Sequence, residues 1–116
     1  MGDPNPTTAN EYEIWRTTNG GNTWSLVPGT NIPAPASGTE YGLTGVYTKL
    51  GSSNIWFGTN EGRIFRSFDA GVTWSVSAQI NAAYSVNEIA FSTVNNGYAW
   101  LYDASANLYQ YQTTDG

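Results

Sequence analysis

The chain has 116 residues, of which 15% are aromatic and 11% are charged, with a formal net charge of −5 and neither Cys nor His. This length allows one small domain, and the missing residue types exclude thiol nucleophiles, disulfides and the zinc or haem sites that depend on them. The basic residues are scattered and no apolar run approaches the ~18 residues of a membrane span, so neither nucleic acid nor a membrane is an expected partner. Abundant aromatic residues, Gly, Asn, Ser and Thr favour an all-β fold with many tight turns.

The first ten residues, MGDPNPTTAN, lack the basic start and apolar core of a signal sequence, so no signal peptide is expected. We predict that they form a loop. Glu11 and Glu13 then alternate with Tyr12 and Ile14, which places both carboxylates on one face of a short strand. Two carboxylates ~5–10 Å apart can hydrolyse a glycosidic bond. A solvated, charged strand edge is the favoured interpretation.

A turn motif follows this strand and recurs along the chain. The first copy, TTNGGNTW, occupies Thr17–Trp24, and the second, SFDAGVTW, occupies Ser67–Trp74. Both fit the pattern Ser/Thr-x-Asp/Asn-x-Gly-x-Thr-Trp, and a third copy begins with TTDG at Thr113. We call these copies the first, second and third box. Their starting positions lie 50 and 46 residues apart.

Four strands are predicted around the second box, at roughly 42–48, 53–59, 63–67 and 73–77, separated by the turns LGSS, TNEG and FDAG. Glu61 lies in the second of these turns. The preceding loop, NIPAPASG at 31–38, contains two prolines that oppose strand pairing. We expect this loop to be a spacer, with a partner-binding loop as the alternative.

The last part of the chain repeats the middle part. IAFSTVNNGYAWLY at 89–102 aligns without a gap with GVYTKLGSSNIWFG at 45–58, so that Trp100 falls on Trp56. Asp103 follows in a turn, DASAN, which the alignment predicts to be two residues longer than TNEG.

The repeat predicts the fold. A period of ~40–50 residues with four strands per unit is typical of a β-propeller blade, whose strands are lettered a to d from the axis outwards. We predict that the whole chain, 1–116, is an all-β fragment of a β-propeller with a little over two four-stranded antiparallel blades. A partial blade with strands c and d lies at about 11–30, a complete blade at about 41–78, and a partial blade with strands a to c at about 84–116.

The turn motif resembles the Asp-box, or BNR repeat, of the propellers of sialidases, sortilin-like receptors, xyloglucanases and photosystem assembly factors. Two full copies and half of a third cover both ends and the middle of the chain. The resemblance implies a secreted or cell-surface, bacterial protein. It implies no particular activity, because the functions of these families are unrelated.

We expect the box residues to be structural. Asp69 can accept hydrogen bonds from the backbone N–H groups just after it, and Asn19 can do the same through its amide oxygen. The box glycines are expected to supply positive φ angles, and the closing tryptophans to bury their rings between blades. The predicted structural residues are Thr17, Asn19, Gly21, Thr23, Trp24, Ser67, Asp69, Gly71, Thr73, Trp74, Thr113 and Asp115.

Arg16 and Arg66 precede the first two boxes at the same position, where the third unit has Gln112. Sialidases of the family bind a carboxylate with three arginines near the propeller axis, which is the alternative that the resemblance implies. Because the boxes belong to the periphery of a blade, we instead expect exposed strand residues or neighbours of the box carboxylates.

Eight aromatic residues are candidates for platforms that stack on sugars, although the aromatic residues of propeller strands mostly fill the space between blades. They are Tyr41, Tyr47, Trp56, Phe57, Tyr84, Tyr98, Trp100 and Tyr102.

These patterns predict a non-catalytic scaffold or binding module, with no catalytic residue, metal or cofactor. The alternatives are part of a glycoside hydrolase of the sialidase or xyloglucanase type, and part of a receptor-type propeller that binds peptides. Partial blades leave apolar faces and strand edges open. We therefore expect self-association with strand exchange across Glu11–Val27 and Ala83–Gly116, or completion by the remaining blades of a longer propeller. A carbohydrate or protein ligand is a further expected partner class.

Overall fold

The computed structural model describes residues 11–116, so the loop predicted for the first ten residues lies outside it. Regular structure in this range is β-strand, apart from one turn of 3₁₀-helix, η1, at Gly29–Asn31. Nine strands form three separate antiparallel sheets, none of which is closed. The prediction of an all-β chain is confirmed. Over the same residues, no helix has the length and apolar character that crossing a membrane requires.

The sheets contain two, four and three strands, which pair in chain order within each sheet. The first sheet holds β1 (Trp15–Arg16) and β2 (Ser25–Leu26). The second holds β3 (Gly42–Leu50), β4 (Asn54–Thr59), β5 (Ile64–Ser67) and β6 (Ser75–Val76). The third holds β7 (Ser85–Phe91), β8 (Gly97–Tyr102) and β9 (Leu108–Thr113). The four strands predicted around the second box are all present, with ends that differ from the prediction by at most two residues.

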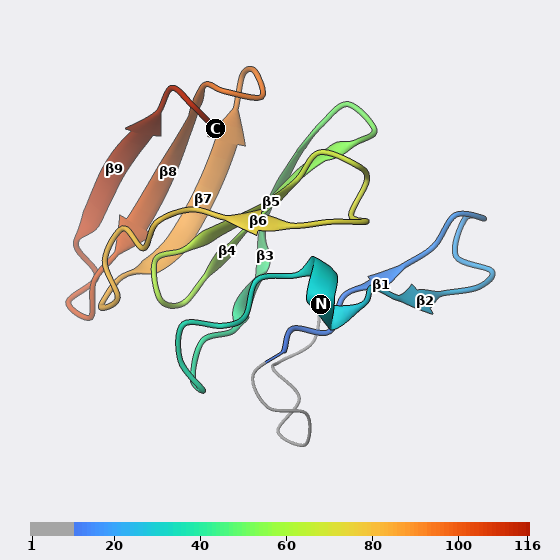
Figure 1. Cartoon of the computed structure of the whole chain (residues 1–116). Helices are drawn as coiled ribbons and strands as arrows, with labels where there is room; N and C mark the ends of the chain where they lie inside the picture. The colour runs from blue at the N-terminus through green and yellow to red at the C-terminus, as the bar shows by residue number, and fades with distance from the viewer. Residues whose placement is uncertain (1–10) are drawn as a thin grey trace.

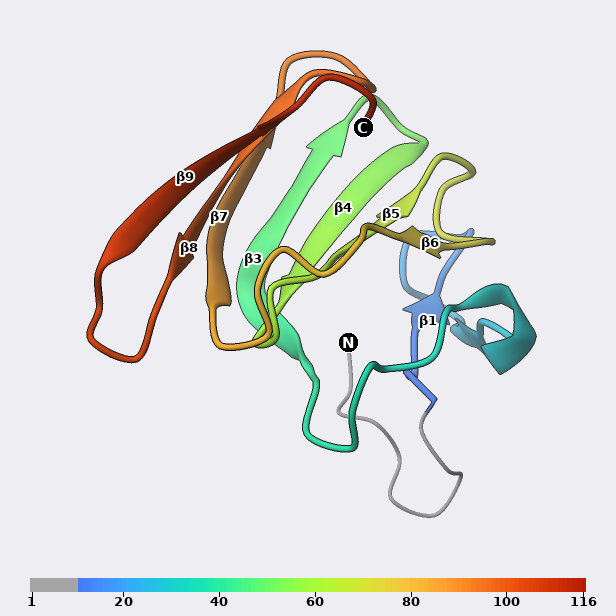
Figure 2. The same cartoon turned by 60° about the vertical axis from the view of Figure 1, so that its left-hand side comes forward.

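The sheets lie next to one another in chain order, with the second sheet between the other two (Figure 1). β7 lies beside β3 and contacts both β3 and β4, which joins the third sheet to the second (Figure 2). The first sheet is a hairpin that stands apart at the other side of the second sheet (Figure 1).

Two hydrophobic clusters fill the spaces between the sheets. The cluster between the first and second sheets contains Tyr12, Val27, Ile32, Phe57 and Phe65. The cluster between the second and third sheets contains Trp56, Val86, Ile89, Ala99 and Leu101. Trp56 and Phe57 belong to different clusters because adjacent residues of a strand point to opposite faces of the sheet. Each face of the second sheet therefore carries one cluster, although Tyr47 of β3 remains exposed on the face of Phe57.

The turn between β8 and β9 is not longer than the turn between β4 and β5, contrary to the prediction from the alignment. Thr59 N donates a hydrogen bond to Arg63 O at 3.0 Å, and Asp103 N donates to Asn107 O at 3.1 Å, so both turns close over the same span. The two additional residues lie in β9, which has six residues where β5 has four. An inserted pair preserves the alternation of a strand, so the faces of β9 keep their direction.

Candidate functional site

The second box is a turn held by its own side chains. Asp69 Oδ1 accepts hydrogen bonds from Val72 N at 3.0 Å and Thr73 N at 2.9 Å. Ser67 Oγ donates to Oδ1 at 2.8 Å, and Thr73 Oγ1 donates to Oδ2 at 2.6 Å. Ser67 Oγ also accepts from Gly71 N at 2.8 Å. Both carboxylate oxygens are therefore engaged inside the turn.

These bonds stabilise the ionised form of Asp69 and lower its pKa to about 2, with the Thr73 hydroxyl as the largest cause and the Thr73 N–H as the next. A general acid or base works best with a pKa near the working pH. The carboxylate of the second box is thus suited to holding a turn and poorly suited to proton transfer near neutral pH.

The first box repeats this geometry with an amide. Asn19 Oδ1 accepts hydrogen bonds from Thr23 N and from Thr17 Oγ1, both at 3.0 Å, and Thr17 Oγ1 accepts from Gly21 N at 2.9 Å. Asn19 Nδ2 donates to Thr23 Oγ1 at 2.8 Å. The donor and acceptor of this last bond are exchanged relative to the second box, because the threonine hydroxyl can play either part.

The third box begins in the same way, since Thr113 Oγ1 donates to Asp115 Oδ1 at 2.8 Å. The fourth position has a positive φ in all three boxes: 71° at Gly20, 60° at Ala70 and 76° at Gly116. For a residue with a Cβ, this left-handed conformation costs ~1–2 kcal/mol. The hydrogen bonds of the second box therefore hold Ala70 in a conformation that it would not adopt alone.

Each of the two arginines reaches the box of the following unit. Arg16 Nε donates to Ala70 O of the second box at 2.9 Å. Arg66 Nη1 donates to Gly116 O, the equivalent atom of the third box, and Arg66 Nε donates to Ser75 Oγ at 3.1 Å. The prediction for these arginines is exposed strand residues or neighbours of the box carboxylates, and Arg66 Nη1 also donates to the backbone oxygen of Asp115 at 3.4 Å. Their observed partners include backbone carbonyls of the next box, and neither arginine is fully exposed.

The two box tryptophans differ in burial. In both, the indole Nε1 donates to the carbonyl of the box glycine, at 3.1 Å for Trp24 and 3.2 Å for Trp74. Trp74 is partly buried against the first hydrophobic cluster, with its ring edge-on to Phe57 at a centroid distance of 5.1 Å. Trp24 is 56% exposed, so the prediction that it buries its ring between blades is wrong. Within residues 11–116, no further sheet lies on the outer side of the first hairpin.

A buried ionic cluster that the sequence patterns did not indicate lies at the end of the spacer loop. Glu40 has no exposed surface; its Oε1 lies 3.1 Å from Arg63 Nε, within ion-pair distance although not aligned for a hydrogen bond. Glu40 Oε2 accepts from Ala36 N at 2.6 Å, and Arg63 Nη2 donates to Ala34 O at 2.9 Å. Burial, followed by the charge of Glu40, raises the pKa of Tyr12. The cluster fastens the loop to the second sheet.

The spacer loop also supports the second box. Asn31 O accepts from Trp74 N at 2.8 Å, and Asn31 Nδ2 donates to Val72 O at 3.1 Å. Ile32 and Pro35 are buried. These contacts fit the expectation of a spacer, because one end of the loop is bonded to the second box and the other end to the Glu40–Arg63 cluster.

The turn carboxylates Glu61 and Asp103 are also engaged, Glu61 by the spacer loop and Asp103 by its own turn. Glu61 Oε1 accepts from Ser37 Oγ and from Thr39 Oγ1, the latter at 2.9 Å. Asp103 accepts from the side chain and the N–H of Asn107, both at 3.0 Å, and these bonds, in that order, are the largest causes that lower its pKa. The carboxylate of Asp103 therefore shapes its turn, and that of Glu61 ties the turn between β4 and β5 to the spacer loop.

Glu11 and Glu13 precede β1, and the strand predicted over them begins only at Trp15. The carboxylate of Glu11 lies over Gly29, where an added Cβ would stand 2.5 Å from Glu11 Oε2. Because this carboxylate is the far end of an exposed, flexible side chain, it could move aside for a larger residue at Gly29.

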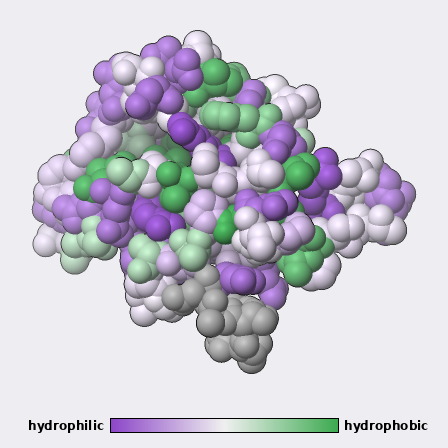
Figure 3. Space-filling model, viewed as in Figure 1, coloured by the Kyte–Doolittle hydropathy of each residue, from purple (hydrophilic) through white to green (hydrophobic). Residues whose placement is uncertain are grey.

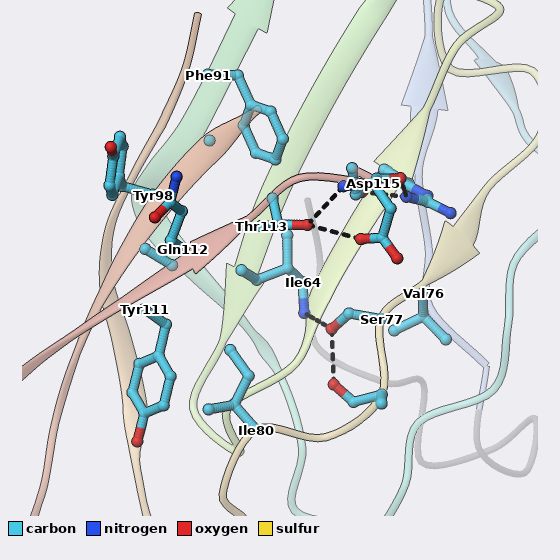
Figure 4. A pocket seen from close by; sticks show the side chains of 15 residues that line it. Ile64, Val76, Ser77, Ile80, Phe91, Tyr98, Tyr111, Gln112, Thr113 and Asp115 are labelled. Atoms are coloured by element: carbon cyan, nitrogen blue, oxygen red, sulfur yellow. Dashed lines mark hydrogen bonds between the residues drawn. The ribbon is translucent and has the colours of Figure 1, made fainter. Parts of the chain in front are cut away.

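Grooves lie between the sheets, and two of them are large. The larger, about 600 Å³, lies between β1 and the second sheet, and its lining includes Trp15, Trp24, Tyr47, Lys49 and Phe57. The other, about 420 Å³, lies between the second and third sheets, and its lining includes Ile64, Ile80, Phe91, Tyr111 and Thr113 (Figure 4). Hydrophobic residues gather around the hollow between these sheets (Figure 3). Both grooves are apolar in character, and over the described residues no three His, Cys, Asp or Glu side chains gather to hold a metal ion.

The aromatic candidates fall into separate places. Trp56 and Phe57 are buried and cannot act as platforms. Tyr98, Trp100 and Tyr102 form one row along β8, on the face of the third sheet opposite the buried Ala99 and Leu101.

The remaining three aromatic candidates do not join this row. Tyr41 and Tyr47 are exposed on or beside β3. Tyr84 stacks on Tyr109 at a centroid distance of 4.8 Å, and hydrogen bonding between them is the first cause that raises the pKa of Tyr109 to about 12.

Comparison of the chain with protein-family models, with characterised proteins and with solved structures finds no match.

Proposed function

We propose that the chain is a non-catalytic scaffold or binding module, and that its three sheets are consecutive blades of an Asp-box β-propeller. The observation that carries this proposal is the repeated contact between units: Arg16 binds the second box and Arg66 binds the third box through equivalent backbone carbonyls. A contact that recurs from unit to unit is expected of stacked repeats.

The candidate catalytic groups support a structural role. The carboxylates of Asp69 and Asp103 are bound within their own turns, that of Glu61 is bound by hydroxyls of the spacer loop, and that of Glu40 is buried beside Arg63. Glycoside hydrolysis requires two carboxyl groups that flank a bond accessible to substrate. Side chains that are already committed to turns fit a scaffold better than a hydrolase.

The proposed setting is secreted or on the cell surface. The remaining blades of a longer propeller, or other copies of this chain, would cover the open faces of the first and third sheets. A carbohydrate or protein ligand is the alternative occupant of the aromatic row on β8, in place of a neighbouring blade or copy.

A screen with chromogenic glycosides tests the proposal against its main competitor. We expect no turnover by the wild-type chain at any pH from 4 to 8, a range in which glycosidase carboxyl groups work. Turnover that Glu11→Gln or Asp103→Asn abolishes, in variants with an unchanged circular dichroism spectrum, would replace the scaffold by a hydrolase. Asp69→Asn is the matched control for loss of a carboxylate, because it introduces the residue that the first box already contains, and it should leave any turnover unchanged.

A further inference from the structure

The contacts between neighbouring sheets follow one rule, which can be extended beyond the chain. Ile14 and Arg16 of the first unit correspond to Ile64 and Arg66 of the second. Both isoleucines pack into the hydrophobic cluster that lies between their own sheet and the next one. Both arginines donate a hydrogen bond to the backbone oxygen of the fourth residue of the next box, Ala70 or Gly116. Each unit therefore has a forward face, which packs on the next unit, and a backward face, which receives the previous one.

The backward face of the second sheet is covered. Phe65 has no exposed surface, and Val76 and Trp74 are partly buried. The residues that cover them come from the first unit, namely Tyr12, Ile14 and Val27.

The backward face of the first sheet is open. Trp15, Leu26 and Trp24 correspond to Phe65, Val76 and Trp74, and they are 53%, 49% and 56% exposed. Trp15 and Trp24 also border the groove beside β1, but the ring of Trp15 lies on the strand face opposite Ile14 and Arg16. Trp15 and Leu26 are directly paired across the hairpin, so they form one apolar surface beside the box. Three large apolar side chains exposed together mark an interaction surface.

The forward face of the third sheet is open as well. Gln110 and Gln112 occupy the positions of Ile64 and Arg66 at the box end of β9, allowing for the longer strand, and Tyr98 is paired with Gln112. Tyr98 and Gln112 border the groove that Ile64 and Tyr111 line (Figure 4), and strand alternation places their side chains on the face of the third sheet opposite Ala99 and Tyr111. The side-chain amide of Gln112 can donate a hydrogen bond, as the guanidinium groups of the arginines do.

We propose that a second copy of this chain docks head to tail, with the Tyr98–Gln112 face of one copy on the Trp15–Leu26–Trp24 face of the next. Gln112 of one copy would donate to Gly20 O of the other, because Gly20 has the box position of Ala70 and Gly116. The occupant is a second copy because the contact from an arginine to the next box, which the chain already makes twice, has an open position at each end of the chain: Gln112 on one side and Gly20 on the other. The proposal deepens the proposed function by naming the partner and its surface.

Head-to-tail contacts use two different surfaces, so they either close into a ring or grow into a chain. A self-complementary pair of identical faces would instead stop at a dimer. This difference allows a decisive mixing experiment, in which each variant has lost one face.

The experiment measures molar mass by light scattering from micromolar to submillimolar concentration. We expect the mass of the wild type to rise with concentration, and Trp15→Lys and Tyr98→Lys to stay monomeric when each is alone. An equimolar mixture of the two variants should form a dimer with twice the monomer mass, because one intact pair of faces remains. Val94→Lys, which changes an exposed apolar residue in a turn outside both faces, should behave as the wild type.

The polar contact has its own test. Gln112→Arg restores the residue of the first two units, so it should shift self-association to several-fold lower concentration, whereas Gln112→Glu should shift it to higher concentration. If either lysine variant loses its folded circular dichroism spectrum, Leu26→Lys and Tyr102→Lys take their places.

A monomeric wild type at submillimolar concentration would overturn the proposal, as would a mixture in which the two variants remain separate. A variant that dimerises alone would show a contact between identical faces and would also overturn it. Oligosaccharide binding by a monomeric wild type, lost in Tyr98→Lys, would assign the face to carbohydrate instead. Glycoside turnover is measured separately, so its presence would overturn only the proposed function.

Discussion

The first and second boxes make nearly the same set of hydrogen bonds in different surroundings. In each, an Asx side chain binds the N–H of the box threonine, a hydroxyl two residues earlier binds the N–H of the box glycine, and the indole binds the glycine carbonyl. The exchange of Asn19 for Asp69 changes the charge of the turn and preserves its shape.

The second box is additionally held by its neighbours. Ala70 N donates to Ser53 O at 2.9 Å, its carbonyl accepts from Arg16, and Trp74 N donates to Asn31 O. The side-chain hydrogen bonds of the first box join residues no more than four positions apart. The motif by itself closes the turn, whereas burial of its tryptophan depends on a neighbouring unit.

Removing the two tryptophans should show this difference most clearly. Trp74→Ala should lower the free energy of unfolding by about 2–4 kcal/mol, below the full value for a core tryptophan because the ring is only partly buried. Trp24→Ala should cost less than about 1 kcal/mol at protein concentrations where the chain is monomeric. Urea unfolding followed by circular dichroism measures both. Equal losses of unfolding free energy would mean that the hydrogen bond from the indole, and not burial of the ring, sets what each tryptophan contributes to stability.

The hydroxyl that opens each box gives the next contrast. Ser67 is 2% exposed, so Ser67→Ala leaves the buried Gly71 N–H without its acceptor and should cost about 1–3 kcal/mol. Thr17→Ala should cost about 1 kcal/mol or less, since water can reach the first box. Ser67→Thr keeps the hydroxyl and is the matched control. A loss for Thr17→Ala as large as that for Ser67→Ala would contradict the role given to burial.

The sequence allowed the turns to be predicted because their partners are close along the chain. Asp69 binds groups within four residues, and the spacing of the box gives those directly. Arg16 and Ala70 are 54 residues apart, and Glu40 meets Arg63 only after the spacer loop packs. No local pattern contains such pairings. The exposure of Trp24 was missed for the same reason, since burial of a ring depends on whether another sheet covers it.

The fourth position of the box provides a reciprocal pair of substitutions. An added Cβ at Gly20 meets nothing within 4 Å, so Gly20→Ala should lower stability only through its positive φ, by about 1 kcal/mol. Ala70→Gly should raise stability by about 1 kcal/mol or less, because the relief of strain is partly offset by the greater backbone freedom of glycine when unfolded. Thermal unfolding of both variants checks the pair. A stabilising Gly20→Ala would contradict the turn geometry.

The charge of the second box gives the smallest expected effect, because its carboxylate is exposed and screened by solvent. The pKa of Asp69 in the folded chain is about 2, below the ordinary value of 3.8, so its stabilisation is present above pH 3.8 and is lost as the pH falls towards 2. Asp69→Asn should flatten the pH dependence of stability in that window relative to the wild type. The difference between the two proteins removes the contributions of the other carboxyl groups, including Asp103. An NMR titration of the Asp69 carboxyl carbon sharpens the test with Thr73→Val, which removes the hydroxyl that is the largest cause of the shift. The pKa should then rise towards 3.8, and an unchanged value in this variant would show that the hydroxyl does not hold the carboxylate in solution.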